Sequence, residues 1–188
     1  MSILIIAEHD NKNLSAATLN TVTAASQIGK EMDILVVGNT CNDVSKECSQ
    51  IPQIRSILEA DSEEYKNFVA ENVSNLIIDL SKDYSHILAP SSTTGKNIMP
   101  RVAALLDVMQ ISDIIKVVDD ETFQRPIYAG NALSTIKSND KIKIITVRST
   151  AFEASENSGG NAEIKSINGS GDTKMSKFVK SELSSSER

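Results

Sequence analysis

Short apolar runs alternate with segments of helical length over the first 106 residues, and this alternation constrains the fold more than any other feature. Residues 3–6 are wholly apolar, residues 34–38 and 86–90 are mainly apolar, and residues 54–58 alternate weakly. Unbroken apolar runs of this length are typical of strands buried on both faces, as in parallel sheets. The pattern predicts an α/β, Rossmann-like parallel sheet with helices on both faces.

The segments between these runs carry helical signals. The clearest is at residues 64–81, where apolar side chains recur every three or four residues. Residues 15–28 form a second candidate helix, which Gly29 is expected to end. The remaining helices are expected around Cys41 and Cys48, and from the polar turn at residues 91–95 to about Leu106.

The rhythm changes after Asp113. Strand-like segments lie at residues 114–118, 122–128, 132–136 and 142–148. The middle two predict an antiparallel hairpin around residues 129–131. No helical pattern separates the four segments, so we expect their pairing to be mostly local and antiparallel. Two late strands are expected at residues 162–167 and 177–183, and the Ser-rich residues 184–188 are typical of a linker.

Charge and cysteine content exclude several classes of function. The net charge of −6 comes from 19 basic and 25 acidic residues, so no nucleic-acid partner is expected. Cys41 and Cys48 lack a nearby histidine, so we expect reduced thiols and no metal site. No apolar run approaches the roughly 20 residues of a membrane span, and no basic region precedes the first run. We therefore expect a bacterial, cytoplasmic protein that is not a membrane protein.

Three segments are expected at the carboxyl ends of the parallel strands, where such sheets bind ligands: residues 7–10, 38–40 and 90–96. Thr93, Thr94 and Gly95 open a helix directly after a strand, and free N–H groups there favour phosphate. The spacing of a P-loop is not met, and we favour plain helix capping by about three to one. No nucleophile motif accompanies the acid–imidazole cluster at residues 8–10, so we interpret it as a solvated turn and assign no catalytic residue.

Two stretches suit a docking surface. The hairpin combines arginine and tyrosine with a proline that fixes one backbone angle and a glycine that permits a tight turn. Its candidate interface residues are Arg125, Pro126, Tyr128, Gly130 and Asn131. An internal hairpin that completes the domain's own sheet is an equally good interpretation. Arg101, which lies among apolar residues, is a further interface candidate, and structural pairing with an acid such as Asp107 or Asp113 is at least as well supported.

Four blocks of sequence, taken in order, resemble the alpha subunits of electron transfer flavoproteins. The blocks are residues 7–10 with 19–25, residues 100–107 with 110–113, residues 123–131, and residues 146–148 with 150–152. Each block alone is weak, and together they are specific. The resemblance covers residues 7–152 and implies the adenine nucleotide alpha hydrolase-like variant of the predicted fold.

The resemblance also implies a function. Members of this family pair with a beta subunit as a heterodimer and accept electrons on FAD from acyl-CoA and other dehydrogenases, in fatty acid beta-oxidation. They pass the electrons to a quinone oxidoreductase. Residues 1–183 then correspond to the N-terminal domain, and residues 184–188 to the start of a linker. The FAD-binding domain is expected to be absent from this chain, and no cofactor is expected on the residues present.

Two alternatives of other classes stay open. The first is a stand-alone nucleotide-binding regulatory domain of the same fold, which would bind AMP or ATP at residues 93–97. The second is an ATP-dependent enzyme of the same superfamily. Such an enzyme has a Gly-rich loop after its first strand, and residues 7–10 hold no glycine there.

Overall fold

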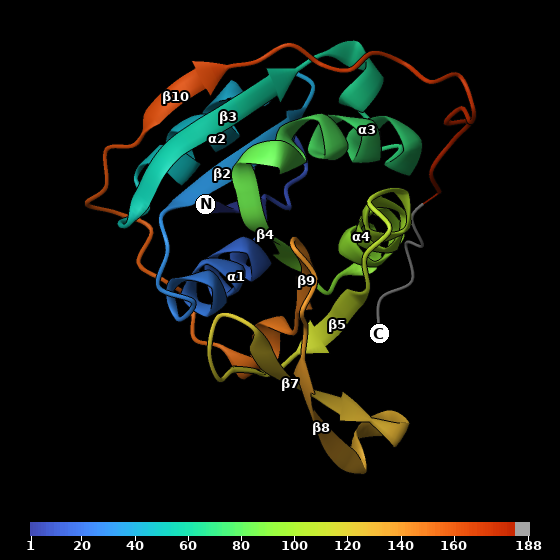
Figure 1. Ribbon diagram of the computed structural model, residues 1–188. Coiled ribbons are helices and arrows are strands. Elements are labelled where there is room, and N and C mark those ends of the chain that lie inside the picture. Colours follow the sequence, from blue (N-terminus) through green and yellow to red (C-terminus); the bar gives the residue numbers. More distant parts are fainter. Residues whose placement is uncertain (183–188) are drawn as a thin grey trace.

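The computed structural model describes residues 1–182 and is built on a seven-stranded parallel sheet (Figure 1). Its strands are β1 (Ser2–Ile6), β2 (Met32–Gly38), β3 (Ile54–Asp61), β4 (Tyr84–Pro90), β5 (Gln110–Ile114), β9 (Lys143–Val147) and β10 (Glu163–Ser166). Their order is β10-β3-β2-β1-β4-β9-β5, and each neighbouring pair is parallel. The predicted α/β class is therefore confirmed.

Helices cover both faces of this sheet. They are α1 (Ala16–Ser26), α2 (Asn42–Ser49), α3 (Ala70–Leu80) and α4 (Thr93–Leu105). Along β1, Ile3 and Ile5 pack into the apolar cluster that includes α1 and α2, while Leu4 and Ile6 pack into the cluster that includes α3 and α4. Successive side chains of a strand point to opposite faces, so an unbroken apolar run fills two cores.

Two helix starts and one helix stop follow the sequence signals. The Ser15 Oγ accepts a hydrogen bond from the Ala17 N–H at 3.3 Å and caps α1. Gly29, soon after the end of α1, has a φ of 78°, a left-handed conformation that glycine adopts without strain. The Ser92 Oγ accepts from the Gly95 N–H at 3.2 Å and caps α4.

A second, small sheet projects from the body at the bottom of Figure 1. It contains β6 (Lys116–Val117), β7 (Thr122–Ile127) and β8 (Ala132–Lys137), all antiparallel, with the 3-10 helix η3 (Tyr128–Gly130) at the hairpin tip. The predicted hairpin is confirmed. The strand expected at residues 114–118 is divided, because β5 ends at Ile114 and only two residues of β6 follow.

The expectation of local, antiparallel pairing is wrong for residues 142–148. β9 lies between β4 and β5 and is parallel to both. All five of its residues are buried, as in the other central strands. The small sheet therefore forms the crossover between the parallel strands β5 and β9, where a helix is usual. We predicted antiparallel pairing because the sequence shows no helix between these two strands.

The long helix expected at residues 64–81 is shorter than predicted. Residues Glu63–Tyr65 form the 3-10 helix η1, and Phe68 then has a left-handed φ of 52°, so α3 begins only at Ala70. The chain continues after α3 as the 3-10 helix η2 (Ser81–Asp83). A fourth short 3-10 helix, η4 (Ser149–Ala151), follows β9.

The first late strand is confirmed as β10, and the second is wrong in the part that the structure describes. Residues 177–182 form no strand. Residues 172–175 instead run across α3 as a strap. The buried Asn72 of α3 holds this strap: the Asn72 Oδ1 accepts from the Thr173 N–H at 3.0 Å, and the Asn72 Nδ2 donates to the Asp172 Oδ1 at 3.1 Å. Residue 183 and the predicted linker lie outside the described residues.

Candidate functional site

The crevice between the carboxyl ends of β1 and β4 is where a sheet of this strand order binds ligands. Here it is nearly filled beside Gly95. Gly95 of α4 lies so near β4 that an added Cβ would stand 2.0 Å from the Pro90 carbonyl oxygen. The cavity that remains beside Ala7 and Ile98 measures about 20 Å³. That volume fits one water, whereas ligand pockets measure about 300 Å³ or more, so this cavity itself has no room for a nucleotide.

The three residues of the predicted phosphate site lie together in the first turn of α4. The Gly95 N–H already donates to Ser92, which confirms the capping interpretation for that group. An open depression of about 590 Å³ adjoins Thr93 and Thr94, and Lys96 and Asn67 also line it. Phosphate binding at this surface stays a prediction.

The acid–imidazole cluster is not the solvated turn that we predicted. His9 is buried, and its Nδ1 accepts from the Asn11 N–H at 3.0 Å. Its ring meets that of Phe68 edge-on, with 5.2 Å between ring centroids. Burial lowers the pKa of His9 to about 4. The imidazole is therefore neutral and packed, while Asp10 is exposed and caps its own turn through Asn13.

The two cysteines are buried thiols at α2. Burial raises the pKa of Cys41 and of Cys48 to about 12, so neither is a thiolate near neutral pH. Among residues 1–182, no three histidine, cysteine or acidic side chains come together as metal ligands would.

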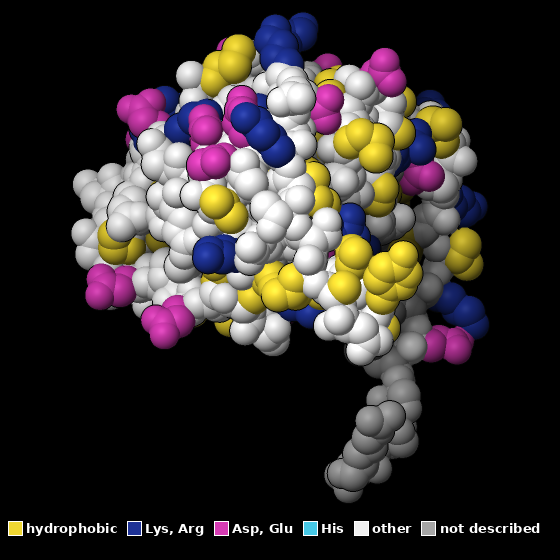
Figure 2. Space-filling model, turned by 60° about the horizontal axis from the view of Figure 1, so that its bottom comes forward, with side chains coloured by type: hydrophobic (Ala, Val, Ile, Leu, Met, Phe, Trp, Pro, Cys, Tyr) yellow, Lys and Arg dark blue, Asp and Glu magenta, His cyan; other side chains and the backbone are white. Residues whose placement is uncertain are grey.

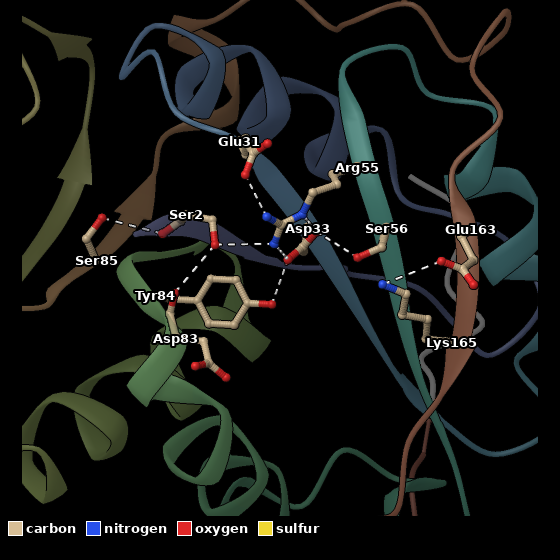
Figure 3. Close-up of polar contacts among 10 residues, drawn as sticks. All are labelled: Ser2, Glu31, Asp33, Arg55, Ser56, Asp83, Tyr84, Ser85, Glu163 and Lys165. Atoms are coloured by element: carbon tan, nitrogen blue, oxygen red, sulfur yellow. Dashed lines mark hydrogen bonds and ion pairs between the residues drawn. The ribbon is translucent and has the colours of Figure 1, made fainter.

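A polar cluster that was not predicted from the sequence lies at the opposite, amino ends of the strands (Figure 3). Arg55 of β3 donates from Nε to the Asp33 Oδ1 at 3.0 Å and from Nη1 to the Glu31 Oε2 at 2.6 Å. Asp33 is buried on β2 and also accepts from the Ser56 hydroxyl at 2.7 Å and the Tyr84 hydroxyl at 2.8 Å.

We interpret this cluster as structural, because its donors and acceptors hydrogen-bond to one another. Burial alone would raise the pKa of Asp33, but hydrogen bonds from Arg55, Ser56 and Tyr84 outweigh it and lower the pKa. The second Nη of Arg55 contacts Asp33 and Ser2 as well. Nearby, the exposed Lys165–Glu163 pair of β10 spans 3.5 Å at the edge of the sheet.

The hairpin of the small sheet brings most of the predicted interface residues together. These are Arg125 and Pro126 on β7, Tyr128 and Gly130 in η3, and Asn131 directly after it. The tip is stiff. Tyr128, Ala129 and Gly130 have successive φ values of 50°, 53° and 90°, and Asn131 Nδ2 donates to the Tyr128 carbonyl at 3.0 Å. A tip held by its own hydrogen bonds loses little freedom when it docks.

Two large apolar side chains at the tip end of this hairpin are exposed. Tyr128 is 80% exposed and Leu133, which pairs with Pro126, is 63% exposed. Leu133 was not among the predicted interface residues, although it shares one face of β8 with Thr135 and Lys137, whose polarity indicates that this face is exposed. Figure 2 turns the bottom of the molecule toward the viewer, and hydrophobic side chains lie across its lower middle with few acidic side chains between them.

Two arginines carry buried guanidinium nitrogens. Arg125 points to the inner face of the hairpin, opposite Ser134, and Arg101 lies apart on α4. The Nε atom of each is buried and has no hydrogen-bond partner among the described residues. The expected pairing of Arg101 with Asp107 or Asp113 is wrong: its Nη2 lies 3.7 Å from the Met175 Sδ of the strap.

The fold and these surfaces define a doubly wound α/β domain with a nearly filled cavity beside Gly95 and a projecting hairpin that exposes Tyr128 and Leu133. Residues 3–171 match the model of the electron transfer flavoprotein domain, and the chain belongs to that family. In the part of the chain that the structure describes, no helix combines the length and the apolarity that a bilayer span requires.

Similar proteins are alpha subunits of this family. The chain is 49% identical to the electron transfer flavoprotein subunit alpha of Pseudomonas aeruginosa over 188 residues, which are all of this chain and 61% of that protein. It is 44% identical to the subunit alpha of Bradyrhizobium diazoefficiens, with 100% and 60% covered. The mitochondrial subunit alpha of Dictyostelium discoideum is 47% identical, with 88% and 49% covered. The chain thus spans about half to three fifths of these relatives.

Proposed function

We propose that this chain is the scaffold and docking domain of an electron transfer flavoprotein alpha subunit, and that its hairpin contacts the beta subunit. The observation that carries the proposal is the stiff, exposed apolar tip at Tyr128 and Leu133. Interfaces are enriched in tyrosine at their centres, and Tyr128 is exposed at the tip of this hairpin. The names of the similar proteins, which are alpha subunits, support a beta subunit as the partner.

The wider role that we propose belongs to the whole heterodimer. It takes electrons from acyl-CoA and other dehydrogenases in the bacterial cytoplasm and delivers them to a quinone oxidoreductase through FAD. We assign FAD to the part of the alpha subunit that this chain does not span, because the cavity beside Gly95 has no room for a dinucleotide. An electron carrier positions its flavin and needs no protein acid or base, so we assign no catalytic residue.

Binding of purified beta subunit tests the docking role. The chain and its Tyr128→Ala and Leu133→Ser variants are titrated against the beta subunit, with Lys46→Ala on the exposed face of α2 as the control. We expect each hairpin substitution to weaken binding about 30-fold, as for an interface hot spot of about 2 kcal/mol, and the control to bind like the wild type.

Two outcomes would contradict the proposal. The first is a hairpin variant that binds as tightly as the wild type. The second is a failure of beta subunit to bind even when the full alpha subunit is supplied. An isolated chain that is purified with stoichiometric FAD would contradict the assignment of the flavin to another part of the subunit.

A further inference from the structure

The small sheet joins the body through a bulge at the end of β5. The register of β5 against β9 shifts between Ile111 and Ile114. Asp113, inside the bulge, has a left-handed backbone with a φ of 61°. Bulges of this kind bend a strand and redirect it. Only Ile115 separates β5 from β6, so the bulge sets the direction in which the small sheet leaves the body.

Contacts between Asp113 and the end of β9 hold the bulge. The Asp113 N–H donates to the Thr146 Oγ1 at 2.8 Å, and the Arg148 N–H donates to the Ile114 carbonyl at 3.0 Å. The Arg148 Nε donates to the Asp113 Oδ2 at 3.1 Å, and its Nη2 contacts the same oxygen. Aspartate adopts a left-handed conformation more readily than most residues, and these contacts with Thr146 and Arg148 hold Asp113 in it here.

The base of the small sheet is anchored and its tip is not. Phe123 is fully buried in the body's apolar core, and the Ile115 N–H donates to the Gln124 carbonyl at 2.8 Å. From Gln124 to Tyr128 the chain advances four residues, or about 13 Å at the rise of a strand. Any rotation at the bulge therefore moves the tip much more than the base.

A second tie lies at the other end of the small sheet. The buried His86 of β4 bonds through Nε2 to the Asp120 carbonyl at 2.6 Å, and Lys30 pairs with the Asp120 carboxylate at 3.2 Å. These contacts hold the turn between β6 and β7. The small sheet is thus tied to the body at this turn as well as at the bulge that contains Asp113.

Resting on the docking role proposed above, we infer that Asp113 and Arg148 are positioning residues whose ion pair fixes the angle at which the hairpin is presented to the beta subunit. Neither residue needs to touch the partner. The pair acts through the bulge, and its effect appears at Tyr128 and Leu133.

A distance measurement on the chain alone tests the geometry. Spin labels are placed at Thr135→Cys on the outer face of β8 and at Lys82→Cys on the body, both exposed. The native cysteines are buried and resist labelling, because their pKa values are about 12. We expect one narrow distance distribution in this labelled chain. Asp113→Asn keeps the size and tolerates a left-handed backbone, yet removes the charge, and should broaden the distribution about twofold.

The matched control is Lys137→Gln, which removes the exposed Lys137–Glu121 pair within the small sheet and leaves the junction intact. It should leave the distribution narrow. Asp113→Asn and Arg148→Gln chains that both give the narrow distribution would overturn the inference.

Affinity for the beta subunit supplies the second readout. Asp113→Asn and Arg148→Gln should weaken binding about tenfold while the melting temperature changes little. Tyr84→Phe, in the remote amino-end cluster, should lower the melting temperature and leave the affinity unchanged. An affinity loss that follows melting temperature across all three variants would overturn the positioning role. A wild-type chain that does not bind refutes the docking role instead, and the distances, which need no partner, tell the two failures apart.

Discussion

The body and the small sheet use similar side chains in opposite ways. In β1, β2 and β4 every residue is buried, and apolar side chains on alternate positions fill two cores. In β8, exposed and half-buried residues alternate, and Leu133, Thr135 and Lys137 face solvent. Stability therefore resides in the body, whereas the small sheet leaves apolar area free for a partner.

The substitution with the largest expected effect removes the one large side chain that the small sheet places in the core. Phe123→Ala should lower the free energy of unfolding by about 3–5 kcal/mol, because its ring is fully buried. Urea denaturation measures this loss. Hydrogen exchange should also accelerate in β7 and β8 more than in β1. A loss below about 1 kcal/mol would show that the two regions do not share a core.

The pH dependence of stability should come largely from two buried histidines. His9 belongs to the body, and His86 ties the body to the small sheet; burial lowers the pKa of each to about 4. The unfolded chain takes up these protons near pH 6.5, so it binds more protons than the folded chain between pH 6.5 and pH 4. Above pH 6.5 both histidines are neutral in the folded and in the unfolded chain, and they cost no stability. As pH falls from 6.5 to 4, the free energy of unfolding should decrease by about 3 kcal/mol for each histidine.

Denaturation midpoints at pH 7, 5.5 and 4.5 check this window. His86→Gln should flatten the curve and should also loosen the turn at Asp120 in hydrogen exchange, whereas His9→Gln should flatten the curve without affecting that turn. A stability that stays constant from pH 7 to pH 4.5 would contradict the prediction.

Close packing at the strand-end crevice gives a smaller effect in the body. Gly95→Ala forces a Cβ toward the Pro90 carbonyl, so α4 must shift. We expect a loss of about 1–3 kcal/mol in the free energy of unfolding. Gly130→Asn, at a left-handed position with open space around it, is the matched change in the small sheet and should cost less than about 1 kcal/mol.

The smallest expected effect on stability is at the hairpin tip. Tyr128→Ala removes a side chain that is 80% exposed and should change the free energy of unfolding by less than about 0.5 kcal/mol. Its large effect should be on binding alone. A Tyr128→Ala chain that unfolds as readily as Phe123→Ala would erase the contrast between the two regions.

Local sequence signals predicted the fold correctly wherever the conformation of an element depends on its own residues. The apolar runs of β1, β2 and β4, the caps at Ser15 and Ser92, and the hairpin were all readable from the sequence. The place of β9 was not, because parallel pairing with β4 and β5 is a long-range choice that local pattern does not encode. The start of α3 was missed for a different reason, since Phe68 adopts a left-handed conformation that its residue type disfavours.

The residues of the candidate docking hairpin could be predicted from the sequence, but the contacts that hold the hairpin in place could not. Arg125, Pro126 and Tyr128 are neighbours in sequence, so the hairpin that holds them could be named in advance. The partner of Asp113 could not, because Arg148 is 35 residues away and the two meet through the β5–β9 pairing. The burial of His9 likewise depends on Phe68, which arrives from a distant loop.

The position of β10 has a consequence for self-association. This short strand lies along the outer edge of β3, and its exposed Glu163 and Lys165 give that border of the sheet charge in place of an open apolar row. Charged, short border strands discourage one molecule from adding its sheet to another. Removal of β10 would uncover the backbone of β3, and the chain should then form aggregates rather than remain monodisperse.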